Sequence, residues 1–381
     1  MTTSPTSFSP ARLAKRLVLW GIGLFLLTEG VLWAFFRAPA NPAYPLHFYN
    51  HIPGLKEKVS FEVDRRNLRT LGWTDGDKPA GAVRVLCVGG SATLGQLQDA
   101  ADTWWGQLKL LLEKDFPGTT IQMTAHGAHN GLSLWGAKWA AAHVPELKPD
   151  ILIVNFGGGE VLVQPFEYKY DPKRIDSLSA LKSTRAGWKN SILAVSQLAR
   201  WKAARNRRSE SLLMENTVGR EDYFQEQFKK ARASYQASPP VRLPFRLSDA
   251  DPKNEYLDAL KTFRDVAAAA GAKLVISGEP CLLSYLLTEE LSNLCCMPVP
   301  KSSGGREAYR PDPEQIEQEM RRFQEAAKAF ADEHKIPFVE VNEQVPRDPE
   351  HFVNELILTD KGAHAMAAVL LPEIRKAIKT K

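Results

Sequence analysis

The chain has 381 residues, of which 44% are hydrophobic and 24% are charged. These values are typical of globular proteins, and the length is sufficient for one large domain or two of ordinary size. The formal net charge of +5 is small for this length, so the composition argues against a nucleic-acid partner.

The N-terminal part of the chain contains one long apolar segment. Residues 17–36 are apolar apart from Thr28 and Glu29, and this is about the length that a helix needs to cross a bilayer. The preceding residues 1–16 carry three basic side chains. Because positive charge before a span favours a cytoplasmic N-terminus, we predict a single-pass protein of a bacterial inner membrane, with its main domain in the periplasm.

A cleaved signal peptide is the alternative interpretation of this segment. Ala38-Pro39-Ala40 resembles a cleavage site, but the apolar run is longer than the hydrophobic region of an ordinary signal peptide. The sequence therefore favours a retained anchor, and both interpretations predict export of the domain.

Glu29 is an unusual residue for a membrane span. A carboxyl group in lipid is costly and often marks a contact with a partner, so a membrane-protein partner could dock through this helix. The alternative is that Glu29 stays protonated or reaches toward the interface.

The pattern after the span predicts an α/β domain. Residues 37–80 are rich in proline and read as a stalk and lead-in, and residues 81–381 form the domain. Runs as apolar as those that follow suit parallel strands covered on both faces. Five such runs occur, at residues 83–88, 120–124, 151–156, 273–277 and 337–341.

Helical patterns alternate with these runs. Residues 134–143 and 256–270 read as helices, a third shows an apolar face from Ile316 to Phe330, and a last one begins near Asp360 with Thr359 as its N-cap. Strands that alternate with helices predict a doubly wound parallel sheet.

A long helical insertion, about residues 160–253, separates the third and fourth strands. It contains a basic patch, formed by Arg200, Lys202, Arg205, Arg207 and Arg208. A solvated helix face explains this patch, and contact with an anionic lipid, polymer or partner is the alternative.

The chain has four cysteines. Cys87 falls in a predicted strand and reads as a small core residue. Cys281, Cys295 and Cys296 cluster in one later segment, where a disulfide from Cys281 to one of the vicinal pair is expected in an exported protein. No histidine lies nearby at ligand spacing, so we predict neither a metal site nor a cofactor.

The first strand ends in a motif of the kind that carries chemistry. Residues 88–95 read VGGSATLG, and ligands of doubly wound sheets bind at the carboxyl ends of the strands. The glycines allow a tight turn that presents the hydroxyl of Ser91 near backbone N–H donors. The alternative is that a small polar residue is needed only to make the turn and cap the helix.

Three further segments complete a recognisable set. They read HGAHNG at residues 126–131, FGGGE at 156–160, and NELILTDKGA at 354–363. Together with the first motif, they resemble the SGNH/GDSL hydrolases over about residues 60–375, and most of all the large membrane-anchored bacterial members. The resemblance implies a flavodoxin-like order of the five parallel strands and an ester-hydrolase site.

The resemblance also implies a role for each matched position. Ser91 matches the family's nucleophile, and Gly131 matches the glycine whose N–H helps to hold an oxyanion. Gly159 stands where the family has an asparagine that donates to the oxyanion. Loss of one such donor typically costs about 100- to 1000-fold in rate.

The last segment departs furthest from the family pattern Asp-x-x-His-Leu-Thr. Asn354 stands at the aspartate position and Ile357 at the histidine position. An isoleucine cannot accept a proton, and loss of the base in a serine hydrolase costs roughly a million-fold. Three positions that depart together favour a loss of catalysis.

Other imidazoles could replace the missing base. Asp348-Pro349-Glu350-His351 also spells Asp-x-x-His, although its spacing to Thr359 differs from the family's. His126 and His129 lie on the second segment and are further candidates.

Two hypotheses follow. The first is a membrane-anchored, catalytically degenerate SGNH/GDSL-like protein that binds or scaffolds something outside the cytoplasm. The second is an active serine esterase that uses Ser91 with a non-standard base, either an O-deacetylase of envelope polysaccharide or a hydrolase of other acyl esters. That substrate class is implied by the resemblance alone.

Overall fold

The structure is a computed structural model, and the chain divides into two units. One unit comprises residues 45–172 and 212–381 and contains nearly every described residue. The other, residues 1–44 and 173–211, lies almost entirely outside them. The described residues are 44–64, 66, 68–127, 132–162, 223–241, 252–284, 286–296, 299–300 and 308–380.

Several sequence predictions fall outside these ranges. They concern the membrane span at residues 17–36 with Glu29, the basic patch at 200–208, and the site residues His129 and Gly131. Within the described ranges, no helix is both long enough and apolar enough to cross a membrane.

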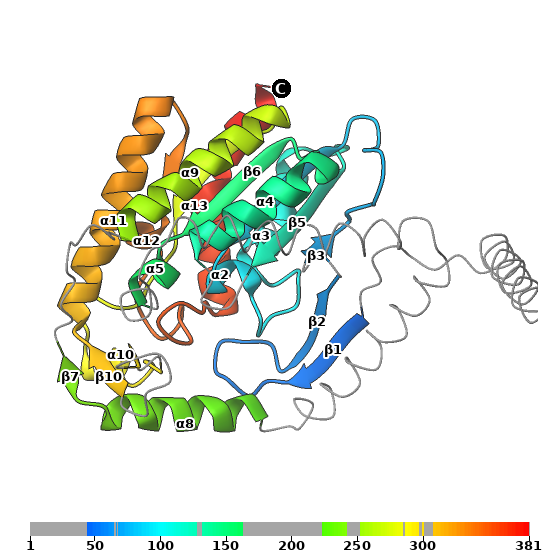
Figure 1. Cartoon of the computed structure of the whole chain (residues 1–381). Helices are drawn as coiled ribbons and strands as arrows, with labels where there is room; N and C mark the ends of the chain where they lie inside the picture. The colour runs from blue at the N-terminus through cyan, green and yellow to red at the C-terminus, as the bar shows by residue number, and fades with distance from the viewer. Residues whose placement is uncertain are drawn as a thin grey trace, which may run out of the picture. The chain divides into compact units, whose positions relative to one another are not determined.

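The core of the domain is one six-stranded sheet, drawn in Figure 1. Its strands lie in the order β11 (Phe338–Val339), β8 (Lys273–Gly278), β6 (Ile151–Phe156), β4 (Val83–Gly89), β5 (Ile121–Gly127) and β3 (Leu68–Leu71). The first five are parallel and match the five predicted runs. Their order is the flavodoxin-like order that the resemblance implies.

The number of strands differs from the prediction. β3 pairs antiparallel with β5 at the edge of the sheet, and it comes from the segment read as an irregular stalk and lead-in. Four residues with only two buried positions give too weak a pattern to be recognised as a strand, and the pairing with β5 supplies the missing information.

Helices cover both faces of the sheet. Leu86 and Val88 of β4 point to one face, where they pack with α4 (Ser133–Leu147), α9 (Pro252–Ala269) and α11 (Pro313–His334). The alternate residues Val85 and Cys87 point to the other face, toward α3 (Trp104–Asp115) and α13 (Asp360–Lys379). This arrangement explains why every residue of β4 is buried and why its sequence is apolar apart from Arg84.

The predicted helix signals are confirmed where the structure describes them. The Thr359 hydroxyl accepts a hydrogen bond from the N–H of Gly362, so α13 begins as expected. The apolar face of α11, from Ile316 to Phe330, is buried.

Shorter elements surround the carboxyl edge of the sheet. Four are helices: α2 (Ser91–Leu94), α5 (Gly158–Leu162), α10 (Glu289–Ser292) and α12 (Val341–Gln344). Strands β1 (Tyr44–Tyr49) and β2 (Lys58–Val63) pair, and β7 (Pro240–Val241), β10 (Ala308–Pro311) and β9 (Val299–Pro300) form a small sheet. Helix α8 (Tyr223–Ala237) follows the part of the insertion outside the described residues.

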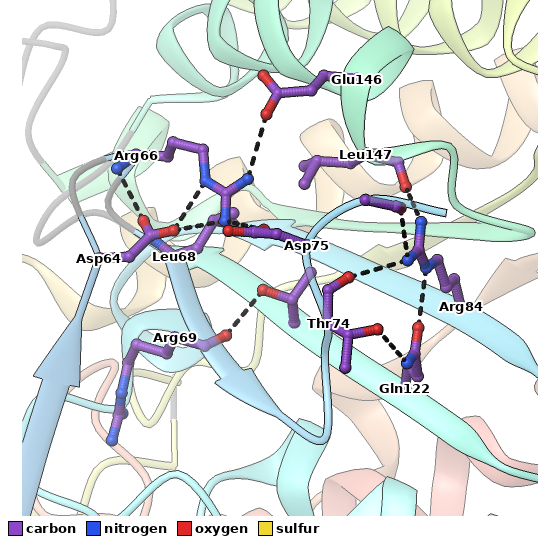
Figure 2. Close-up of polar contacts among 12 residues, drawn as sticks. Asp64, Arg66, Leu68, Arg69, Thr74, Asp75, Arg84, Gln122, Glu146 and Leu147 are labelled. Atoms are coloured by element: carbon purple, nitrogen blue, oxygen red, sulfur yellow. Dashed lines mark hydrogen bonds and ion pairs between the residues drawn. The ribbon is translucent and has the colours of Figure 1, made fainter. Parts of the chain in front are cut away.

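Polar contacts attach the lead-in to the domain (Figure 2). The Arg66 guanidinium pairs with Asp64, Asp75 and, on α4, Glu146. The buried guanidinium of Arg84 donates to the backbone oxygens of residues 74, 76 and 147. Residues 64–76 are therefore an integral part of the domain.

The predicted disulfide is absent. All four cysteines are buried free thiols. The Cys295 thiol donates to the backbone oxygen of Leu291, and the thiol of Cys296 lies 3.7 Å from a Glu355 carboxylate oxygen. The thiols therefore use local polar partners and do not bond to one another.

Candidate functional site

The candidate site lies where the strand order reverses. In the sequence of parallel strands, β5 lies on one side of β4 and β6 on the other, so the loops after β4 and β6 diverge at their carboxyl ends. Such a switch point is where open α/β sheets bind ligands. Ser91 follows β4, and Gly157 to Glu160 follow β6.

Ser91 is the first residue of the short helix α2 and is only 3% exposed. The turn before it is tightly packed. A Cβ atom on Gly90 would lie 2.5 Å from a carboxylate oxygen of Glu279, and one on Gly127 would lie 2.3 Å from the backbone nitrogen of Leu94. Glycine is required at these positions because neighbouring backbone and side chains fill the space.

Arg69 holds the far end of the same loop. Its guanidinium donates to the backbone oxygens of Leu94, Gly95 and Gln98, each at 2.7 Å. Burial lowers the pKa of Arg69 to about 10, which leaves the guanidinium charged at neutral pH. An arginine from edge strand β3 thus fixes the loop that carries Ser91.

Glu279 is a site residue that the sequence analysis missed. It follows β8 directly, is fully buried, and reaches the two loops of the switch point. One carboxylate oxygen accepts from the N–H of Ala92 at 3.4 Å and the other from the N–H of Gly158 at 3.0 Å. Burial, and next the charge of Glu160, raise the pKa of Glu279 to about 8.

A second buried carboxyl group lies beside the first. Glu160 is 2% exposed and accepts from the N–H of Gly157 at 3.1 Å and from that of Ser133, the first residue of α4. Burial raises its pKa. The two glutamates therefore connect the loops after β4 and β6 and the start of α4 through backbone N–H groups.

Asn354 is a structural residue of its loop. Its side-chain oxygen accepts from the N–H groups of Leu356 and Ile357 at 3.0 and 2.8 Å, and its amide donates to the sulfur of Cys296 at 3.2 Å. An aspartate could make the first two bonds, but it could not donate the third.

Ile357 belongs to an apolar cluster. It is 3% exposed and packs with Phe48, Leu97 and Val353, and side chains of α8 pack against this cluster. Ile357, which the sequence analysis matched to the base of the SGNH/GDSL hydrolases, is therefore a core residue.

The alternative bases have other contacts. His351 places Nδ1 2.7 Å from an Asp348 carboxylate oxygen, and among the described residues this carboxylate is the one side-chain partner of its imidazole. The ring of His126 stacks on Trp139 of α4 at 4.0 Å between centroids. His129 and Gly131 lie outside the described residues.

The comparisons with known proteins give structural matches only. No protein-family model matches the chain, and no curated protein matches its sequence. Solved structures of esterases and of a GDSL-like lipase do match it.

Three of these structures illustrate the range. An acetylxylan esterase from Geobacillus stearothermophilus is 12% identical, with a TM-score of 0.41 over 77% of this chain and 94% of that one. A GDSL-like lipase from Bacteroides thetaiotaomicron is 14% identical, with a TM-score of 0.36 over 77% of this chain and 88% of the lipase. A carbohydrate acetylesterase family member from Sinorhizobium meliloti is 15% identical, with a TM-score of 0.37 over 78% of this chain and 99% of the acetylesterase. Identities this low concern the fold and leave the activity open.

Proposed function

We propose that this chain is a catalytically degenerate SGNH/GDSL-like domain that binds a ligand or partner. The observation that carries the proposal is the burial of Ile357 in an apolar cluster, at the position where the family's base would stand. Without a base, a serine hydroxyl is a poor nucleophile at neutral pH. Asn354, with its backbone bonds, keeps the shape of the loop after the catalytic pair is lost.

The test is a comparison of the wild type with Ser91→Ala on p-nitrophenyl acetate and butyrate. We expect equal rates, because a serine without a base adds nothing to the background. In an active serine hydrolase the same change would cost roughly a million-fold. A wild-type rate at least about tenfold above that of Ser91→Ala would refute the proposal.

One observation favours an active ester hydrolase as the second candidate. Asp348 and His351 form a hydrogen-bonded carboxylate–imidazole pair, which is the arrangement that orients a base. If the wild type is active, His351→Gln should abolish the activity under this second hypothesis. His126→Gln and His129→Gln test the remaining imidazoles in the same assay.

We further propose that residues 17–36 anchor the domain to the outer face of a bacterial inner membrane. The basic residues before the apolar segment support this orientation. In spheroplasts, external protease should digest the domain while the protein remains in the membrane fraction. Recovery of a soluble form that begins near Asn41 would instead show cleavage.

A further inference from the structure

Helix α8 borders two cavities that share one side chain, Phe228. The first, of about 270 Å³, is called here the apolar cavity. The second, of about 290 Å³, is called the basic cavity. Neither contains Ser91 among its described lining residues.

The apolar cavity lies at the two degenerate catalytic positions. Asn354 and Ile357 form part of one wall, and Phe224, Phe228 and Ala231 of α8 form another. Its described lining residues include no charged side chain. A dry apolar cavity of about 150 Å³ is large enough to bind benzene, so this one can accept a phenyl ring or a short aliphatic chain.

The basic cavity also has a mainly apolar lining, to which two cationic side chains contribute. Lys229 and Arg232 of α8 line it together with Ile52, Pro53 and Phe228. The guanidinium of Arg232 donates to the backbone oxygen of Val353 at 3.1 Å and lies over the ring of Phe228 at 5.8 Å.

Arg232 is incompletely partnered. Its Nε–H is buried and makes no hydrogen bond, and among the described residues no carboxylate lies within ion-pairing distance of its guanidinium. Buried polar groups normally have partners, and guanidinium groups bind carboxylates and phosphates through paired N–H donors. A guanidinium without a carboxylate partner among the described residues is suited to bind an anion.

We propose that the two cavities form one binding site for a small amphiphilic anion. The apolar part of the ligand fills the cavity beside Ile357, and its carboxylate or phosphate binds Arg232, with Lys229 adding positive charge. Phe228 lines both cavities, so the two lie next to each other along α8. This inference rests on the proposed function, because a ligand seated at positions 354 and 357 needs these positions free of catalytic groups.

The experiment measures binding of 4-phenylbutyrate and of its uncharged analogue 4-phenylbutan-1-ol to the full-length chain by calorimetry. A hydrogen-bonded charge contributes about 1.5–3 kcal/mol, so the acid should bind at least about tenfold more tightly than the alcohol. Arg232→Gln should remove this preference and leave binding of the alcohol within about twofold.

Two further variants localise the site. Ala231→Phe should fill the apolar cavity and weaken both ligands at least about tenfold. Lys230→Gln removes a charge from the same helix at a residue that pairs with Glu226 and is not among the residues described as lining either cavity, so binding should stay unchanged. Circular dichroism verifies that each variant is folded.

Several outcomes would overturn the inference. They are absence of binding of either compound, equal affinities for both, or an equal loss of acid binding in Lys230→Gln and Arg232→Gln. The hydrolysis assay with Ser91→Ala is independent of these measurements. If the wild type does not hydrolyse the esters and binds neither compound, only this inference is wrong. If the wild type hydrolyses the esters faster than Ser91→Ala, the proposed function is wrong.

Discussion

Replacement of Glu279 by glutamine is expected to flatten the dependence of the domain's stability on pH. The buried carboxyl has a pKa of about 8, against an ordinary value of 4.5. A raised pKa means that the folded state holds a proton that the unfolded state releases between these two values. The free energy of unfolding contributed by Glu279 is therefore fully present below about pH 4.5 and is lost as the pH rises through 8.

The size of the loss makes it measurable. A shift of this kind corresponds to a few kcal/mol at most, and burial of Glu160 acts in the same direction. Glutamine cannot ionise, and its single side-chain oxygen can accept from only one of the two N–H groups, of Ala92 and Gly158, that Glu279 serves with its two oxygens. Urea unfolding at about pH 5.5 and about pH 8.5 should show a large decrease for the wild type and a smaller one for Glu279→Gln.

A matched control separates the pH dependence that comes from Glu279 from that of the other ionisable groups. Glu290 is exposed and lies in the segment that follows, so Glu290→Gln should retain the wild-type difference between the two pH values. If Glu279→Gln also retained it, the carboxyl would be ionised in the folded state across the range, and the raised pKa would be wrong.

The central strands of this fold could be predicted because burial on both faces of a sheet requires a run of mainly apolar residues. A central parallel strand such as residues 83–88 is mainly apolar, here at every position except Arg84, and the run ends where the glycine turn begins. The edge strand β3 has no such apolar run. It is short and half-buried, and it is defined by its partner β5, so no local pattern could have separated it from the surrounding loop.

Residues of the candidate site could be predicted only where they belong to a recognisable sequence motif. The turn at Ser91 follows directly from its glycines, and the proposed changes at Asn354 and Ile357 follow from the alignment of the last segment with the family pattern. Glu279 and Arg69 are different, because their partners lie 187 and up to 29 residues away. One signal was available for Glu279: an acidic residue directly after an apolar strand, at the edge where ligands bind.

The role of Arg232 could not be predicted either. On the sequence it is one basic residue in a polar helix, and its significance comes from what surrounds it. Phe228 and the backbone of Val353 position the guanidinium, and no described carboxylate pairs with it. Such an environment is created by the packing of distant segments and leaves no local trace.

Restoration of the catalytic pair is expected to give the largest change in rate. The double variant Asn354→Asp with Ile357→His supplies a base and its orienting carboxylate in the family's register. General-base catalysis contributes about 100- to 10,000-fold. We therefore expect hydrolysis of p-nitrophenyl acetate to rise by about 100-fold or more over the wild type, and Ser91→Ala in the same background should remove the gain.

The structure indicates why the double variant should be less stable than the wild type. The change Asn354→Asp would keep the two bonds to the backbone N–H groups but lose the donor to Cys296, beside the buried carboxyl of Glu355. The change Ile357→His would replace an apolar core contact. Both changes lower stability by about 1–3 kcal/mol each, so the thermal midpoint must be recorded with every rate.

The matched control is Asn354→Asp with Ile357→Gln, which is equally polar but has no base and should remain inactive. Adding Gly159→Asn to the restored pair should raise the rate further, because the asparagine is an oxyanion donor worth about 100- to 1000-fold. The gain should exceed additivity, since the nucleophile, base and oxyanion donor act as a unit. If the restored pair stays folded but is no more active than its glutamine control, position 357 does not face Ser91. The register on which the proposal of a degenerate hydrolase rests would then be wrong.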